Sequence, residues 1–155
     1  MRSIAVAVLG VSLLLVSAPV AFANCAKDDP DGSKTLAARQ QVATDCTCDA
    51  GNPPTVNHGQ YVSCAAGVAN TRSGLDPADP NFLPKTCKGA VKKCAAHSTC
   101  GKPGFATCCV TNPHGVTSCK IKKDAASCTA KNGTPGTCAS CCDACPAPGS
   151  GPTCP

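Results

Sequence analysis

Cys138-Ala139-Ser140-Cys141-Cys142-Asp143-Ala144-Cys145 is the stretch that most constrains the fold, because half of its residues are cysteine. It contains two Cys-x-x-Cys units in direct succession. Four thiolates at this spacing could hold a tetrahedral zinc ion or an iron–sulfur cluster. The same four sulfurs could instead form disulfides with cysteines elsewhere in the chain. The redox compartment decides between the two, and the N-terminus of the sequence indicates that compartment.

The first 23 residues have the features of a secretory signal peptide. Met1-Arg2-Ser3 supplies a positive charge, and an apolar run from Ile4 to Val16 follows it. Pro19 breaks the run, and Ala21-Phe22-Ala23 matches a small-residue cleavage site, so we expect cleavage after Ala23. A signal anchor is the alternative, because residues 4–23 are long enough to cross a bilayer. Cleavage would leave no membrane span and would place the protein outside the cell or in the periplasm, where thiols oxidise.

All 16 cysteines lie beyond the predicted cleavage site, and an even number in an exported chain predicts that all of them pair. They are Cys25, Cys46, Cys48, Cys64, Cys87, Cys94, Cys100, Cys108, Cys109, Cys119, Cys128, Cys138, Cys141, Cys142, Cys145 and Cys154. We therefore expect structural disulfides, with no bound metal or cofactor, since an oxidised sulfur is not a thiolate ligand. Metal binding or thiol exchange through Cys138, Cys141, Cys142 and Cys145 is the alternative. Spacing does not give the connectivity, although we expect Cys64 to pair with Cys87 or Cys94.

Composition shows why cross-links are needed. Without the leader, the chain has 16 cysteines and 13 Leu, Ile, Val or Phe among 132 residues. Cysteine above about 8–10% signals a disulfide scaffold, and so few large aliphatic residues do not support folding by burial alone. We predict a small disulfide-rich α+β fold with two or three short helices, one β-hairpin and long cross-linked loops. The domain should span residues 24–145, followed by a Pro/Gly-rich tail over residues 146–155 pinned by Cys154.

Three stretches have helical patterns, and the segment 24–30 before them reads as irregular. Ser33 is the expected cap of a helix over residues 34–44. Asn57 and Gln60 have capping-box spacing ahead of a helix that should end near residues 73–74, with Tyr61, Cys64, Ala65 and Val68 on one face. A third helix over residues 85–99 should carry Cys87 and Cys94 on its apolar side and end at Gly101.

The pattern then becomes strand-like. Residues 105–111 and 116–121 are rich in Thr, Val and Cys and are separated by Asn112-Pro113-His114-Gly115, which predicts a hairpin with a four-residue loop. An isolated hairpin is marginally stable, so we expect Cys108, Cys109 and Cys119 to tie this one to the helices.

Four stretches of the sequence can be compared with known proteins: Asn57-His58-Gly59-Gln60-Tyr61-Val62-Ser63-Cys64, Cys100-Gly101-Lys102-Pro103-Gly104, the Cys108-Cys109 pair and Cys141-Cys142-Asp143-Ala144-Cys145. Together they resemble stretches of secreted, cysteine-rich bacterial proteins of uncharacterised function. The resemblance covers residues 46–145. It implies export and assigns no activity to any residue.

The charge pattern limits the partners. The formal net charge is +5, and the chain has a single tyrosine and no tryptophan, so base stacking in a nucleic-acid site has little support. Lysines gather at two places, Lys85, Lys88, Lys92 and Lys93 and then Lys120, Lys122 and Lys123. These are either solvated faces or a contact surface for an anionic cell-envelope polymer or another protein.

Chemistry-bearing residues are sparse. The histidines are His58, His97 and His114, and none has a nucleophile at a recognisable spacing. We therefore expect no enzyme, but a secreted, non-enzymatic binding or structural module that acts at or outside the cell envelope. The alternatives are a protease-inhibitor or toxin-like effector that uses the tip at residues 112–115, and a metal-binding or redox protein that uses Cys138–Cys145.

Overall fold

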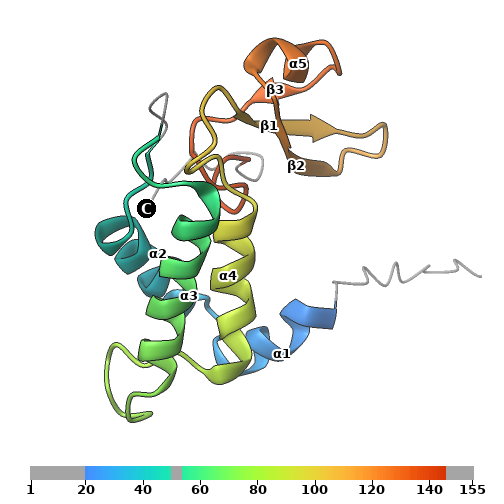
Figure 1. The fold of residues 1–155 in the computed structure, drawn as a ribbon. Coiled ribbons are helices and arrows are strands. Elements are labelled where there is room, and N and C mark those ends of the chain that lie inside the picture. The colour runs from blue at the N-terminus through green and yellow to red at the C-terminus, as the bar shows by residue number, and fades with distance from the viewer. Residues whose placement is uncertain (1–19, 50–53, 146–155) are drawn as a thin grey trace, which may run out of the picture.

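The computed structural model describes residues 20–49 and 54–145. These residues form a helical part and a sheet part (Figure 1). A helical part holds α1 (Val20–Asp28), α2 (Ser33–Asp45), α3 (His58–Ser73), the short 3-10 helix η1 (Lys85–Cys87) and α4 (Lys88–Ala96). A sheet part follows, with β1 (Ala106–Thr111), β2 (Thr117–Lys122), α5 (Ala125–Thr129) and β3 (Thr134–Pro135). This is the small disulfide-rich α+β fold that the sequence predicts. Most of the predicted leader, and the tail with Cys154, lie outside the described residues.

The prediction that residues 24–30 are irregular is wrong in part, because α1 runs from Val20 to Asp28. Its polar sequence gives no helical pattern. The helix contacts η1 and α4, where Cys25 is bonded to Cys87 and the Asp28 carboxylate accepts from the Thr86 hydroxyl (2.7 Å). Asp29 follows the helix and is 4% exposed. The predicted cleavage after Ala23 would remove the first turn of α1 and keep Cys25 with its cross-link.

The helix α2 is confirmed, but its predicted cap is wrong. Ser33 is the first helical residue, and Gly32 precedes it with a φ of 70°. The carboxylate of Asp29 accepts hydrogen bonds from the backbone N–H of Lys34 (3.1 Å) and of Thr35 (2.8 Å), so it serves the free donors of the first turn. A buried acid four residues upstream thus performs the function that the sequence pattern assigned to Ser33.

The helix α3 begins as predicted. The Asn57 side chain accepts from the Gln60 N–H (3.0 Å), and the Gln60 side chain accepts from the Asn57 N–H (2.9 Å), which completes the capping box. The helix ends at Ser73, with Gly74 beyond it. Tyr61 and Ala65 are buried on the predicted face.

The third helix ends earlier than the sequence indicated. The helix α4 stops at Ala96, and Gly101 does not close it. Gly101 instead adopts a left-handed φ of 67° in a loop packed against the backbone of residues 56–58, where a Cβ atom would overlap main-chain atoms. The glycine is therefore needed for the approach of this loop to the start of α3.

The predicted hairpin is present as part of a larger sheet. Its strand order is β2-β1-β3, and both neighbours of β1 are antiparallel to it. The connection between the paired residues Thr111 and Thr117 has five residues rather than four. Val116 belongs to this turn because its N–H donates to the side chain of Asn112 (2.9 Å). The third strand, only two residues long, has no periodic signal in the sequence.

The core of the helical part is built from small residues and cystine. Leu83 and Val91 are its largest fully buried aliphatic side chains among the described residues, and Ala38, Ala65 and Ala69 are completely buried. Figure 1 shows α3 and α4 running side by side, with the sheet part beyond the end where α3 begins and α4 stops. Because so little apolar surface is buried, the helical part and the sheet part need covalent links to stay joined.

Candidate functional site

Seven disulfides are formed among the described cysteines. They are Cys25–Cys87, Cys46–Cys64, Cys48–Cys100, Cys94–Cys142, Cys108–Cys128, Cys109–Cys145 and Cys119–Cys141. Cys138 is disulfide-bonded as well. The predicted pairing of Cys64 with Cys87 or Cys94 is wrong: Cys64 bonds to Cys46, the residue that follows α2. Cys87 in η1 and Cys94 in α4 bond to different parts of the molecule: Cys87 to α1 and Cys94 to the 138–145 segment.

The 138–145 segment joins the two parts of the molecule. Cys141 and Cys145 bond to β2 and β1, while Cys142 bonds to Cys94 in α4. Adjacent residues of a strand point to opposite faces, so Cys109 reaches this segment while Cys108 reaches α5 on the other face. The expected tie between the hairpin and the helices is formed in two ways. Cys108 bonds directly to α5, whereas Cys109 and Cys119 bond to the 138–145 segment, which is linked to α4 through Cys142.

The cysteine cluster is not arranged as a ligand set in this structure. Cys141, Cys142 and Cys145 each bond to a cysteine outside the cluster, so the metal or redox alternative requires these cross-links to be reduced. A second group of possible ligands, Cys25, Asp29 and Cys87, lies close together. Its two sulfurs form one disulfide and its carboxylate caps α2.

The histidines are dispersed. His58 lies between α3 and α4, with Nδ1 2.9 Å from the carbonyl oxygen of Cys100 and Nε2 3.2 Å from that of Ala96. Its ring therefore links the start of α3 to the loop after α4. His97 and His114 are exposed, one after α4 and one in the hairpin turn. The lysines also come from separate elements, four from η1 and α4 and three from the end of the hairpin.

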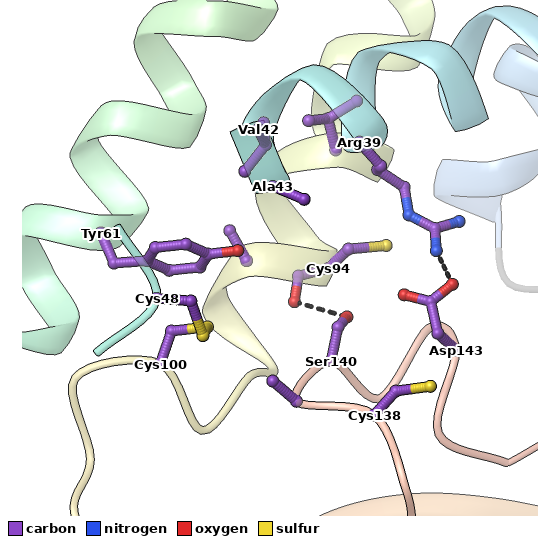
Figure 2. A pocket seen from close by; sticks show the side chains of 13 residues that line it. Arg39, Val42, Ala43, Cys48, Tyr61, Cys94, Cys100, Cys138, Ser140 and Asp143 are labelled. Carbon is purple, nitrogen blue, oxygen red and sulfur yellow. Dashed lines mark hydrogen bonds and ion pairs between the residues drawn. A yellow bond between two sulfur atoms is a disulfide. The ribbon is translucent and has the colours of Figure 1, made fainter. Parts of the chain in front are cut away.

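A cavity of about 210 Å³ lies where the helical part meets the 138–145 segment (Figure 2). Its buried walls are Val42 from α2, Tyr61 from α3, and Val91 and Ala95 from α4. Ala43, Cys48 and Ala139 also line it and are exposed, so they mark its rim. The disulfide Cys48–Cys100 forms part of the wall below Tyr61 (Figure 2). The disulfides Cys48–Cys100 and Cys94–Cys142 thus lie around a preformed cavity that is mostly apolar.

Two polar features face this cavity. The first is Tyr61, which is 7% exposed and makes no side-chain hydrogen bond within the part of the chain that the structure describes. Burial raises the pKa of Tyr61 above its ordinary value, and the nearby positive charge of Arg39 opposes this rise. Figure 2 shows the hydroxyl directed across the cavity. It is therefore a neutral hydrogen-bonding group in an apolar setting.

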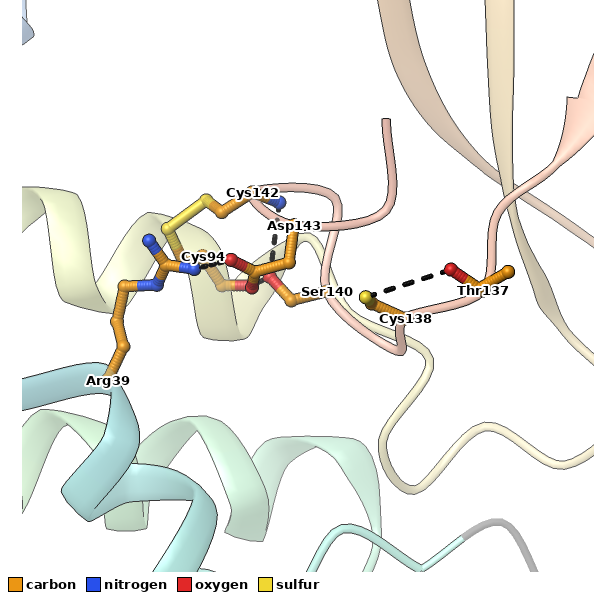
Figure 3. A network of polar contacts seen from close by, with 7 residues as sticks. All are labelled: Arg39, Cys94, Thr137, Cys138, Ser140, Cys142 and Asp143. Carbon is orange, nitrogen blue, oxygen red and sulfur yellow. Dashed lines mark hydrogen bonds and ion pairs between the residues drawn. A yellow bond between two sulfur atoms is a disulfide. The ribbon is translucent and has the colours of Figure 1, made fainter. Parts of the chain in front are cut away.

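The second is an ion pair between Arg39 of α2 and Asp143 of the 138–145 segment (Figure 3). The two side chains are 17% and 7% exposed, and burial lowers the pKa of Arg39. The neighbouring Ser140 hydroxyl donates to the carbonyl of Cys94 (3.1 Å) and accepts from the N–H of Cys142 (3.2 Å). These contacts hold the segment against α2 and α4 beside the Cys94–Cys142 bond.

Sequence reasoning missed Arg39, Tyr61 and Asp143 as parts of one site. Tyr61 was placed on the apolar face of its helix, which is correct, but nothing local indicates the cavity in front of it. Asp143 lies inside the cysteine cluster, and its burial follows from the cross-links on both sides of it. The signal available in the sequence is that Asp143 is a charged residue flanked by cysteines on both sides.

No family model, curated protein or solved structure matches the chain. Within the described residues, no helix is both long and apolar enough to cross a membrane.

Proposed function

We propose that the chain is an exported, non-enzymatic binding module that acts at or outside the cell envelope. The observation that carries this proposal is a preformed apolar cavity enclosed by disulfides, next to Tyr61. Small-molecule sites are concave and mostly apolar, with few polar groups that orient the ligand. Cross-links keep such a cavity open in a chain whose apolar core is too small to do so alone.

Export is supported by the extent of cross-linking, because disulfides form and persist in oxidising compartments. The test is to produce the whole chain in a bacterial host and to measure the intact mass in each fraction. We expect the main product outside the cytoplasm, starting at Asn24 and without free thiols. The matched variant Leu14→Arg interrupts the apolar run and should retain the protein in the cytoplasm with its leader. Equal distribution of both proteins, or an exported product with free thiols, would contradict the proposal.

The hairpin supports a second candidate function, that of an inhibitor-like effector. Residues 111–118 are all exposed, and Val116 is 60% exposed at the tip. The Asn112 side chain accepts from the N–H groups of His114 (3.0 Å) and Val116 (2.9 Å), which makes the turn rigid. Inhibition of a protease panel that is lost on replacing residues 112–116 with a Gly/Ser loop of equal length would support it. Full inhibition by the replaced loop, or none by the native chain, would exclude it.

A further inference from the structure

We propose that the cavity beside Tyr61 binds a small neutral ring compound that carries a hydroxyl group. This inference rests on the proposed role as a binding module and names the class of ligand. Four features support it: the size of the cavity, the nature of its walls, the balance of its charges and the hydroxyl of Tyr61.

The size of the cavity sets the size of the ligand. An engineered protein cavity of about 150 Å³ stays dry and takes up benzene. The cavity here has a volume of about 210 Å³. In proportion, it holds about eight non-hydrogen atoms, which is a six-membered ring with a short substituent.

The walls favour a ring. Val42 and Val91 are 4% and 1% exposed, and they present branched aliphatic surface to the cavity together with Ala95. The ring of Tyr61 and the sulfurs of Cys48–Cys100 line the side nearest to α3 (Figure 2). Aromatic rings pack well against both aliphatic groups and sulfur.

The charges favour a neutral ligand. Arg39 and Asp143 are opposite charges in contact, so the charged part of the lining sums to zero. A charged ligand would enter this partly enclosed site without a free counter-ion, which is costly. An uncharged hydroxyl avoids that cost.

The Tyr61 hydroxyl gives the ligand its orientation. The Tyr61 side chain is 7% exposed, and its hydroxyl has no hydrogen-bond partner among the described residues, so it is free to bind a group inside the cavity. A ligand hydroxyl at the end of the cavity nearest to Tyr61 would accept this hydrogen bond. The ring would then lie between the two valines, with the ion pair of Arg39 and Asp143 closing the far side.

The experiment is a proton–nitrogen NMR titration of the oxidised protein with benzyl alcohol, with toluene as the probe that lacks the hydroxyl and benzoate as the charged probe. We expect saturable shifts of the backbone amides of Ala43, Ala95 and Ala139 with benzyl alcohol. Toluene should bind about fivefold more weakly, which corresponds to one hydrogen bond, and benzoate should not bind.

Two variants sharpen the result. Tyr61→Phe removes the hydroxyl and keeps the ring, so it should weaken benzyl alcohol about fivefold and leave toluene unchanged. Ala43→Leu fills the rim and should abolish binding of both, whereas Ala26→Leu, at an exposed site of α1, should bind like the native chain. Native thermal melting checks that each variant is folded.

The proposal is overturned if benzyl alcohol causes no saturable shifts, if toluene binds as well as benzyl alcohol, or if Tyr61→Phe changes neither. Binding that survives Ala43→Leu would place the ligand elsewhere and also overturn it. The intact mass of the same sample distinguishes failure of this proposal from failure of the proposed export. An exported, fully oxidised protein that does not bind the probe refutes the ligand class and not the export.

Discussion

Replacing Asp143 with alanine should destabilise the protein far more than loss of a surface charge would. The substitution leaves the guanidinium of Arg39, 17% exposed, without its counter-ion. Breaking a buried ion pair on one side costs about 3–5 kcal/mol, while an exposed pair contributes about 0–1 kcal/mol. Arg39 faces the cavity and keeps some access to solvent, so we place the loss in the free energy of unfolding at about 2–3 kcal/mol.

The assay is guanidinium chloride unfolding with disulfides intact, followed by far-ultraviolet circular dichroism. The control is Asp45→Ala, which removes an exposed carboxylate that accepts from Gln41 (3.1 Å) and should cost less than about 0.5 kcal/mol. The double variant Arg39→Met/Asp143→Ala leaves no buried charge, so it should be at least about 1 kcal/mol more stable than the sum of the two single losses predicts. An Asp143→Ala variant as stable as the control, or single losses that simply add, would refute the burial argument.

Three further predictions concern the same framework. Replacing both Cys94 and Cys142 with alanine should lower the free energy of unfolding by about 3 kcal/mol in the same denaturation assay. The reason is that this disulfide closes a loop of about 18 residues, counted along the chain through the remaining bond Cys109–Cys145. An unchanged midpoint would contradict the joining role of this bond. The raised pKa of Tyr61 means that the folded chain holds this proton more tightly than the unfolded chain does, so its contribution to stability is complete below pH ~10 and is lost as the pH rises further. Near-ultraviolet absorbance should show tyrosinate forming at a higher pH in the native protein than in the reduced, denatured chain, and coincident curves would rule out burial of the Tyr61 side chain. Gly101→Ala should lower the melting temperature, because residue 101 has a left-handed φ and its Cβ would overlap the backbone of residues 56–58. The control Gly67→Ala, within α3 and with open space around it, should raise stability by about 0.5–1 kcal/mol. Equal effects of the two substitutions would refute the close approach of the Gly101 loop to the start of α3.

Local signals in the sequence were reliable where the structure is local. The capping box of Asn57 and Gln60 and the hairpin around residues 112–116 depend on residues within a few positions of one another, although the hairpin connection has one residue more than predicted. The helix α1 was missed because its residues after the leader are polar and its attachment is a disulfide to Cys87, 62 residues away. The cap of α2 was misassigned because Asp29 reaches it from outside the usual capping position.

The cavity could not be predicted for a related reason. Its walls come from α2, α3, α4 and the 138–145 segment, and what brings them together is the pairing of cysteines. Sixteen cysteines permit very many pairings, and spacing does not choose among them. The prediction that cysteines hold the fold together was therefore correct, while the positions of Tyr61, Arg39 and Asp143 around one hollow depended on connectivity.

The most direct test of this account is the disulfide map of the exported protein. Partial reduction with stepwise alkylation, followed by peptide mass spectrometry, can distinguish the adjacent residues Cys141 and Cys142. We predict that Cys141, Cys142 and Cys145 are bonded to Cys119, Cys94 and Cys109, respectively. Bonds within the 138–145 segment itself, or free thiols and a retained metal ion there, would contradict the claim that this segment joins the sheet to the helices and encloses the cavity.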